Sequence, residues 1–199
     1  MATFAELVAD VKILTNRPDL DSEIKLAVKA ATLKAHHTDF YPKDLFETGI
    51  SWSPIGYTQS LDYRTLIPRW RSLKYLRKLD STGLIAGAFF TVITPDQSLV
   101  QDEYYIDKTD VCYLGGSNLE IKSSTQETYM MLGCYIHPDI TESGYTSWIA
   151  KDHPYCIEYE ATSKIFKQIG YDEQATMMNK EVTEQFMLLR NSEILAQGS

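Results

Sequence analysis

The side chains of this chain that could do chemistry are its four histidines, three cysteines and scattered carboxylates. His36 and His37 are adjacent and lie close to Asp39, which makes them the best candidates for metal ligands. Adjacent residues on a helix point roughly 100° apart, so the two imidazoles cannot easily bind one ion there. His137 and His153 each precede a proline, and neither has a nucleophile nearby in the sequence. For His36 and His37 we therefore expect polar contacts at a helix end.

Recognisable catalytic motifs are absent from the sequence. It contains no phosphate-binding glycine loop, no dinucleotide-binding fingerprint, no GxSxG or HExxH motif and no cysteine pair with zinc spacing. Cys112, Cys134 and Cys156 are an odd number without paired spacing, which favours reduced thiols in a cytosolic setting over a disulfide framework. We expect a protein that is not an enzyme and that uses no cofactor and no metal.

Two alternatives stay open. The first is a hydrolase or metal-dependent enzyme whose site is assembled only in the fold, with His37, His137 or His153 in a deep pocket. The second is a nucleic-acid-binding module that uses the basic segment Arg64–Lys78. The net charge of −8 argues against tight phosphate binding, which needs clustered Lys and Arg. The plainer interpretation of this segment is a solvated strand edge whose cations discourage stray strand pairing.

Length and hydrophobic pattern indicate the elements that must position these side chains. A chain of 199 residues, 44% hydrophobic and 23% charged, is typical of a soluble globular protein with one domain and room for a subdomain. The apolar run Leu84–Ile93 is too short and too interrupted to span a membrane. The N-terminus lacks the basic and apolar regions of a secretory signal. We therefore expect no membrane partner.

The first forty residues predict two amphipathic helices joined by a short turn. Thr3 and Glu6 form a capping-box pattern, and Pro18 ends the first helix because it pushes the preceding residue out of the α region. Candidate caps of the second helix are Asp19, Asp21 and Ser22. The two apolar stripes consist of Phe4, Leu7, Val8, Val11 and Leu14, and of Ile24, Ala27, Val28, Ala31 and Ala35. The pattern is typical of an antiparallel helical hairpin.

The middle of the chain predicts short strands and turns. After an irregular passage from Phe40 to Gly56, the apolar runs and turn residues are typical of a compact antiparallel sheet or a small sandwich. A helix over Leu84–Phe90 is the one local alternative. The candidate strands are Ser60–Ile67, Trp70–Leu76, Leu84–Val92, Glu103–Ile106, Val111–Leu114, Leu119–Lys122 and Tyr129–Ile136.

The last third of the chain predicts two further helices. Pro154 suits a first helical turn with Asp152 as its cap, and Gly170 supplies a stop. Asp172 can cap the next helix, and residues from Asn191 to Ser199 form a polar tail that a partner would order. We therefore expect an α+β protein: a helical bundle over residues 1–56 and 140–199, with an antiparallel β-rich insertion over residues 57–139.

Three segments of the sequence together resemble one protein family. The first is TFAELVADVKILTNRPDLDSEIKLAVKAATLKAHHTDFYPKDL, the second is VCYLGGSNLEIKSSTQETYMMLGCYIHPDI, and the third is EYEATSKIFKQIGYDEQATMMNKEVTEQFMLLRNSEIL. They are similar to the N-terminal helical hairpin, the β-rich insertion and the C-terminal helical pair of head-to-tail adaptor proteins from tailed bacteriophages. The resemblance covers most of the chain and is weakest between Ile50 and Leu99.

This resemblance implies a structural virion protein. Such adaptors form a homo-oligomeric ring, usually of twelve copies, that joins the portal protein to a tail tube or nozzle protein and continues the DNA channel. The implied location is the head–tail junction of the virion, and the host cytoplasm during assembly. The C-terminal segment of these adaptors commonly docks on the portal. By position, the portal-binding candidates here are Phe186, Leu189, Ile194, Leu195, Ala196, Gln197, Gly198 and Ser199.

An acidic subunit suits a channel through which DNA passes, because strong phosphate contacts would slow the passage. With a net charge of −8, the chain would repel the transiently contacting DNA from a channel wall. An ordinary acidic surface that keeps the protein soluble is the competing interpretation for each residue. Candidates on the polar faces of the C-terminal helices are Glu158, Glu160, Asp172, Glu173, Glu181 and Glu184.

Overall fold

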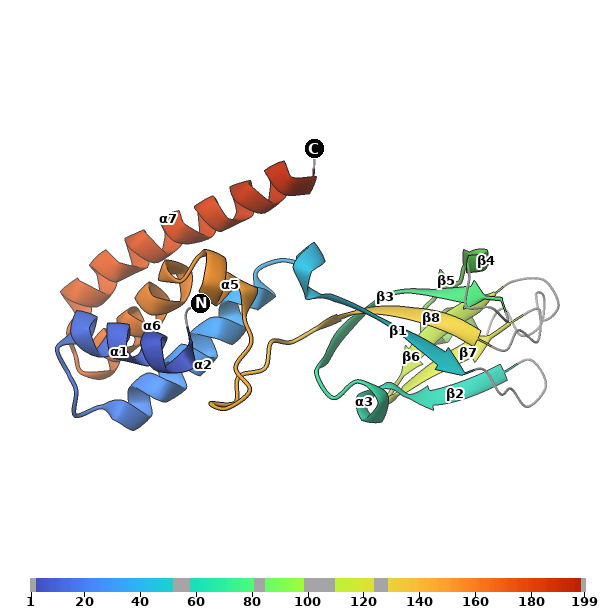
Figure 1. Cartoon of the computed structure of the whole chain (residues 1–199), viewed down its shortest axis with the longest axis horizontal. Coiled ribbons are helices and arrows are strands. Elements are labelled where there is room, and N and C mark those ends of the chain that lie inside the picture. Colours follow the sequence, from blue (N-terminus) through green and yellow to red (C-terminus); the bar gives the residue numbers. More distant parts are fainter. Residues whose placement is uncertain (1–2, 52–57, 81–84, 99–109, 124–128, 198–199) are drawn as a thin grey trace. The chain divides into compact units, whose positions relative to one another are not determined.

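The computed structural model describes residues 3–51, 58–80, 85–98, 110–123 and 129–197 of the chain. Its elements form two compact units, drawn in Figure 1. The helical unit consists of Met1–Asp44 and His137–Ser199, and the β unit consists of Leu45–Ile136. The α+β class is confirmed, with helices from both ends of the chain enclosing the strands in sequence. The unit boundaries fall at 44/45 and 136/137, whereas the sequence suggested 56/57 and 139/140.

The helical unit is built from five α-helices and a short 3₁₀ turn in the part of the chain that the structure describes. The elements are α1 (Phe4–Thr15), α2 (Asp21–His37), η1 (Pro42–Asp44), α5 (Trp148–Asp152), α6 (Tyr155–Gln168) and α7 (Asp172–Gln197). The predicted capping box is confirmed: the Thr3 hydroxyl accepts from the Glu6 amide at 3.2 Å, and the Thr3 amide donates to Glu6 Oε2 at 2.7 Å.

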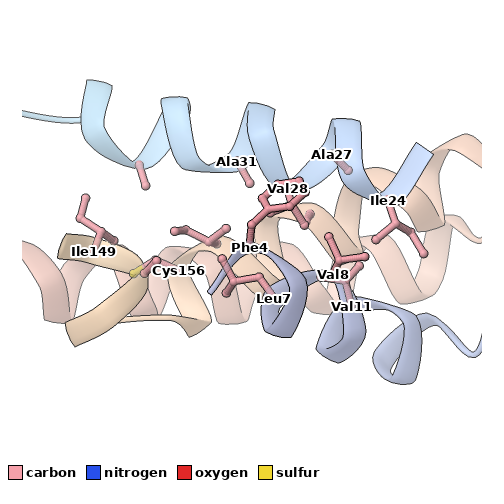
Figure 2. Close-up of a cluster of buried hydrophobic side chains, with 14 of the residues drawn as sticks. Phe4, Leu7, Val8, Val11, Ile24, Ala27, Val28, Ala31, Ile149 and Cys156 are labelled. Carbon is pink, nitrogen blue, oxygen red and sulfur yellow. The ribbon is translucent and has the colours of Figure 1, made fainter. Parts of the chain in front are cut away.

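The core of the helical unit lies between α1, α2 and α6. Figure 2 shows the side chains of α1 and α2 pointing toward one another, with Ile149 and Cys156 closing one end of the cluster. Every residue of the stripe predicted for α2 is buried. The helix α6 packs against α1, α2, α5 and α7, so it is the central helix of the unit. Its surroundings bury even polar positions, among them Glu158 and Glu160.

Several local predictions for the helices are wrong. Leu14 is 40% exposed. The buried side of α1 continues from Val11 to Thr15, so Leu14 lies on the solvent side of the helix. The N-cap of α2 is Leu20, whose side chain makes no capping hydrogen bond. Asp152 ends α5 and does not cap α6, which begins after Pro154. The expected polar tail is helical through Gln197, because α7 continues over the core.

The β unit contains two four-stranded sheets in the described residues. One has the order β1-β8-β3-β4 and the other β2-β7-β6-β5, and all neighbours are antiparallel except the parallel pair β5/β6. Buried residues from both sheets form one core, so the sheets pack as a small sandwich. The strands are β1 (Leu45–Ser51), β2 (Thr58–Asp62), β3 (Trp70–Leu79), β4 (Ile85–Phe89), β5 (Thr91–Val92), β6 (Val111–Gly115), β7 (Asn118–Lys122) and β8 (Tyr129–Ile136).

The strand predictions succeed for β3, β6, β7 and β8, and the strand expected over Leu84–Val92 is divided between β4 and β5. The passage expected to be irregular contains β1, which pairs with β8 from Leu45↔Tyr135 to Ser51↔Tyr129. The strand expected over Ser60–Ile67 ends at Asp62, whose carboxylate caps the one-turn helix α3 (Tyr63–Leu66). The helical alternative for Leu84–Phe90 is wrong, because β4 occupies this stretch. The candidate strand Glu103–Ile106 lies outside the described residues.

Candidate functional site

The solvent-facing side of α7 carries large apolar residues. Met177, Met187, Leu188 and Ile194 are 57–67% exposed on this 26-residue helix. Its other side packs on α6, and Ala175, Val182 and Leu189 are buried there. Exposed polar and charged residues, among them Glu173, Lys180 and Glu181, lie between the exposed apolar residues, so the outer side of α7 is mixed and offers apolar side chains for contacts. The exposed apolar residues therefore mark α7 as a candidate contact surface.

The portal-binding candidates separate into buried and accessible residues. Leu189 is fully buried in the helical core, and Phe186 is half-buried against that core. Ile194 is exposed, and Leu195, Ala196 and Gln197 belong to the last turn of α7. Gly198 and Ser199 lie outside the described residues. Leu189 therefore holds α7 on the bundle, while Ile194 is available for a contact.

The acidic candidates separate in the same way. Asp172, Glu173, Glu181 and Glu184 are exposed on α7. Glu158 and Glu160 are buried on α6, at 6% and 4% exposure, because this helix is covered by its neighbours. Glu160 accepts from Lys34 Nζ at 2.7 Å and pairs with Lys164 Nζ at 3.6 Å. Glu158 forms no hydrogen bond or ion pair with any residue that the structure describes.

Glu158 lines a groove of about 670 Å³ between α1 and α6. We call it the carboxylate groove. Burial, together with a smaller effect of the nearby charge of Asp10, raises the pKa of Glu158 from 4.5 to about 7. The groove thus combines carboxylates with exposed apolar and aromatic side chains. The lining residues that matter for its chemistry are Glu6, Asp10 and Ile13 of α1 and Tyr155, Glu158 and Tyr159 of α6.

A second groove, of about 330 Å³, lies between the end of α2 and α7. Its lining includes Lys34, Phe186, Met187 and Arg190. The ammonium group of Lys34 lies 6.0 Å from the centre of the Phe186 ring and is also paired with Glu160. Arg190 is exposed and forms no ion pair with any described residue. The α2–α7 groove thus holds two cations and the carboxylate of Asp39, whereas the carboxylate groove holds the three carboxylates of Glu6, Asp10 and Glu158.

A buried polar cluster lies where the chain leaves the helical unit. His36 Nδ1 and Asp44 Oδ1 are 2.8 Å apart, and His36 Nε2 and Ser147 Oγ are 2.9 Å apart. The indole of Trp148 donates to the same Asp44 oxygen at 2.8 Å. His36 lies in the last turn of α2 and Asp44 ends η1, so the cluster connects α2, η1 and the start of α5. The polar contact expected at the end of α2 is confirmed for His36.

The other histidines occupy separate places. His37 Nε2 and His137 Nδ1 are 3.2 Å apart, and their rings are stacked with centroids 4.9 Å apart. His153 is the C-cap of α5, and its Nε2 lies 3.4 Å from Ser192 Oγ. Neither of the two grooves has a histidine in its lining. Within the described ranges, no three metal-ligating side chains are grouped closely enough to hold an ion.

The basic segment Arg64–Lys78 lies on α3 and β3, and only part of it lies at a strand edge. From Leu76 onward β3 lies between β8 and β4, so the edge-strand interpretation is wrong for Arg77 and Lys78. Residues 70–75 of β3 pair with β8 alone among the described residues. Lys78 is 6% exposed and pairs with Asp110 at 2.8 Å. The guanidinium of Arg77 lies 4.7 Å from the centre of the Phe89 ring. Lys78 and Arg77 thus have partners inside the β unit, while Arg64, Arg69 and Lys74 are exposed.

The three cysteines are free and fully buried. Burial raises the pKa of the thiols to about 12 for Cys112, about 11 for Cys134 and about 12 for Cys156. Thiols with such pKa values stay protonated at neutral pH and are poor nucleophiles. The cysteines therefore serve as small apolar core residues in both units.

Among the described helices, none is long and apolar enough to cross a membrane. No model of a known protein family matches the chain, and no curated protein matches it.

Sequence reasoning missed three features of these surfaces. It placed Glu158 on a polar helix face, because the cover that α1 provides is not visible in the local pattern. It also missed Asp44 and Ser147 as partners of His36, since Ser147 is 111 residues away in the sequence. The exposed methionines of α7 were a visible signal, since they break the amphipathic pattern.

Proposed function

We propose that this protein is a head-to-tail adaptor of a tailed bacteriophage, a structural virion protein that forms a ring between the portal and the tail. The observation that carries the proposal is the outer side of α7, where four large apolar side chains are 57–67% exposed. Exposed apolar side chains of this size are typical of protein-contact surfaces. The resemblance of the terminal segments to adaptor helices supplies the identity of the partners: further copies of the chain, the portal protein, and a tail tube or nozzle protein.

The portal-docking segment in this proposal begins at Ile194. Leu195, Ala196 and Gln197 follow in the last turn of α7, and Gly198 and Ser199 complete the segment. Phe186 contributes from the α2–α7 groove. Leu189 is excluded from docking because it is buried in the bundle, and its role is to hold α7 in place.

The channel-facing carboxylates in this proposal are those of α7. Asp172, Glu173, Glu181 and Glu184 are exposed and can repel the phosphates of passing DNA. Glu160 is excluded because it is buried and paired with Lys34, and Glu158 is excluded because it is covered by α1. The β unit is left for contacts with tail components or neighbouring subunits.

The test begins with the neighbouring genes, among which we expect a portal gene and a tail gene, and continues with assembly of this chain with their products. We expect native mass spectrometry and negative-stain images to show a ring of this chain on the portal. Removal of residues 194–199 should abolish portal binding while the far-UV circular dichroism stays that of the folded chain. Gln174→Ala, an exposed position near the opposite end of α7 and outside the apolar set, is the control and should keep portal binding. A full-length protein that never joins the portal would refute the proposal.

A second candidate function is a serine hydrolase, favoured by the arrangement Asp44–His36–Ser147. The distances of 2.8 and 2.9 Å match those of a carboxylate, an imidazole and a nucleophilic hydroxyl in hydrolases. Against it, His36 and Asp44 are 2% and 6% exposed, and the Ser147 hydroxyl already accepts from the Ala150 amide as the N-cap of α5. A fluorophosphonate probe tests this directly. Labelling that is lost in Ser147→Ala would favour the hydrolase, and absence of labelling would exclude it.

A further inference from the structure

Glu158 is a buried carboxylate without a donor. It is 6% exposed, it lines the carboxylate groove, and no described residue donates a hydrogen bond to it or forms an ion pair with it. A buried carboxylate in this situation is costly, because neither water nor a cation compensates its charge fully. Asp10 lies near it and adds repulsion. The groove therefore offers a site that a cationic side chain would satisfy.

The apolar side chains around Glu158 define the shape of such a ligand. Ile13 is 76% exposed and Tyr155 is 52% exposed, and both line the groove. The ring of Tyr155 stacks on that of Tyr159, with centroids 5.4 Å apart. A fitting ligand therefore carries a cation next to a large apolar side chain. An amphipathic helix presents these two groups in one stripe.

The chain itself carries such a stripe on α7. Thr183, Met187 and Arg190 are spaced i, i+4 and i+7, so they lie on one side of the helix. We call these residues the α7 stripe. Met187 is 61% exposed, and Arg190 is exposed and forms no ion pair with any described residue. Because Arg190 lines the α2–α7 groove and Glu158 lines the other groove, the two cannot meet within one copy as folded.

We propose that the carboxylate groove of one copy binds the α7 stripe of a second copy, with Arg190 pairing with Glu158 and Asp10. Met187 then packs against Ile13 and Tyr155. Two different surfaces meet in this contact, so it is heterologous. It leaves the stripe of the first copy and the groove of the second copy free for further neighbours. The inference rests on the proposed function in one respect: closure of these contacts into a ring is what the adaptor needs.

The contact is linked to pH through Glu158. The charged and titratable groups that face it are Glu6 and Asp10 of α1 and Tyr155 and Tyr159 of its own helix, and Glu181 of α7 acts on Tyr159. The pKa of Glu158 is about 7 in the single copy. An arginine beside the carboxylate favours the ionised form, so binding releases a proton. Association should therefore strengthen as the pH rises from 6 to 8.

The experiment is a charge swap in the full-length chain, assembled with the portal. Arg190→Glu should weaken the association between copies by at least about tenfold at pH 8, because it places a carboxylate against Glu158 and Asp10. Asp10→Lys combined with Arg190→Glu should restore most of it. The control is Lys167→Glu, which makes the same charge change at an exposed position of α6 that lines neither groove. The readout is the number of copies per portal by native mass spectrometry, at pH 6 and pH 8.

Two results separate this inference from the proposed function. If the wild type forms a ring and Arg190→Glu forms the same ring with the same strength, the groove contact is wrong while the adaptor proposal stands. If the wild type never joins the portal, the adaptor proposal fails, and disulfide trapping still decides the contact. A mixture of Ile13→Cys and Met187→Cys copies should then cross-link between unlike copies, since the native cysteines are buried. Absence of this cross-link would overturn the contact.

Discussion

The two buried glutamates of α6 should respond in opposite ways to the same substitution. Glu158 is buried without a donor among the described residues, whereas Glu160, two positions later, pairs with Lys34 and Lys164. At pH 8 the Glu158 side chain is mostly ionised, because its pKa is about 7. Glu158→Gln removes an uncompensated charge and should stabilise the protein. Glu160→Gln removes two ion pairs and should lower the stability by about 1 kcal/mol.

The size of the Glu158 effect follows from its pKa. The folded protein holds this proton more tightly than the unfolded chain, so the contribution of Glu158 to stability is present below pH 4.5 and is lost as the pH rises toward 7. A difference of one in pKa corresponds to about 1.4 kcal/mol, so a rise from 4.5 to about 7 sets a ceiling of about 3 kcal/mol. Because the groove is open to water, we expect Glu158→Gln to gain about 1–2 kcal/mol over wild type between pH 5 and pH 8.

The assay is urea unfolding followed by far-UV circular dichroism at 222 nm, which reports mainly on the helical unit. Wild type, Glu158→Gln and Glu160→Gln are compared at pH 5, 6, 7 and 8. The stability difference between Glu158→Gln and wild type should grow with pH and level off above pH 7. If this difference is the same at pH 5 and pH 8, or if both substitutions destabilise equally at pH 8, the reasoning about Glu158 is refuted.

Two further predictions concern the β unit and the thiols. Gly133→Ala should destabilise the β unit by about 1–3 kcal/mol, because an added Cβ would lie 2.5 Å from Cε1 of Tyr75, whose hydroxyl is bonded to Glu47. Gly49→Ala in the neighbouring strand, where a Cβ meets nothing within 4 Å, is the control, and equal thermal melts for the two variants would contradict the prediction. The native protein should not react with a thiol reagent at pH 8, while the urea-unfolded chain should react at all three cysteines; rapid labelling of the folded protein would show that a thiol is accessible. The three cysteines are Cys112, Cys134 and Cys156.

Local signals in the sequence were sufficient to predict the helices at both ends of the chain. The capping box of Thr3 and Glu6 and the apolar stripe of α2 depend on residues three to seven positions apart, so they can be read from a short window. The cap at Asp62 was a signal of the same kind. A carboxylate that accepts from the amides two and three residues later predicts a helical turn, and the apolar residues after Asp62 hid it.

Long-range partners decided the features that the sequence did not predict. The strand β1 has only Ile50 fully buried, so it lacks a clear alternation and exists because β8 pairs with it. Glu158 lies on the polar side of α6, and only the packing of α1 over that side turns it into a buried carboxylate. The cluster of His36, Asp44 and Ser147 joins segments more than one hundred residues apart. No window of local sequence contains these relations.

The groove contact explains why the chain would keep a carboxylate that lowers the stability of its folded single copy. In the single copy, Glu158 costs free energy at neutral pH, and a glutamine of the same shape would remove the cost. Functional sites are where sequences break local rules of stability. If Arg190 of a second copy supplies the missing cation, assembly removes the free-energy cost of the unpaired Glu158 carboxylate. Glu158→Gln should then be the more stable protein at pH 8 and the poorer partner, a combination that a purely structural role for Glu158 does not produce.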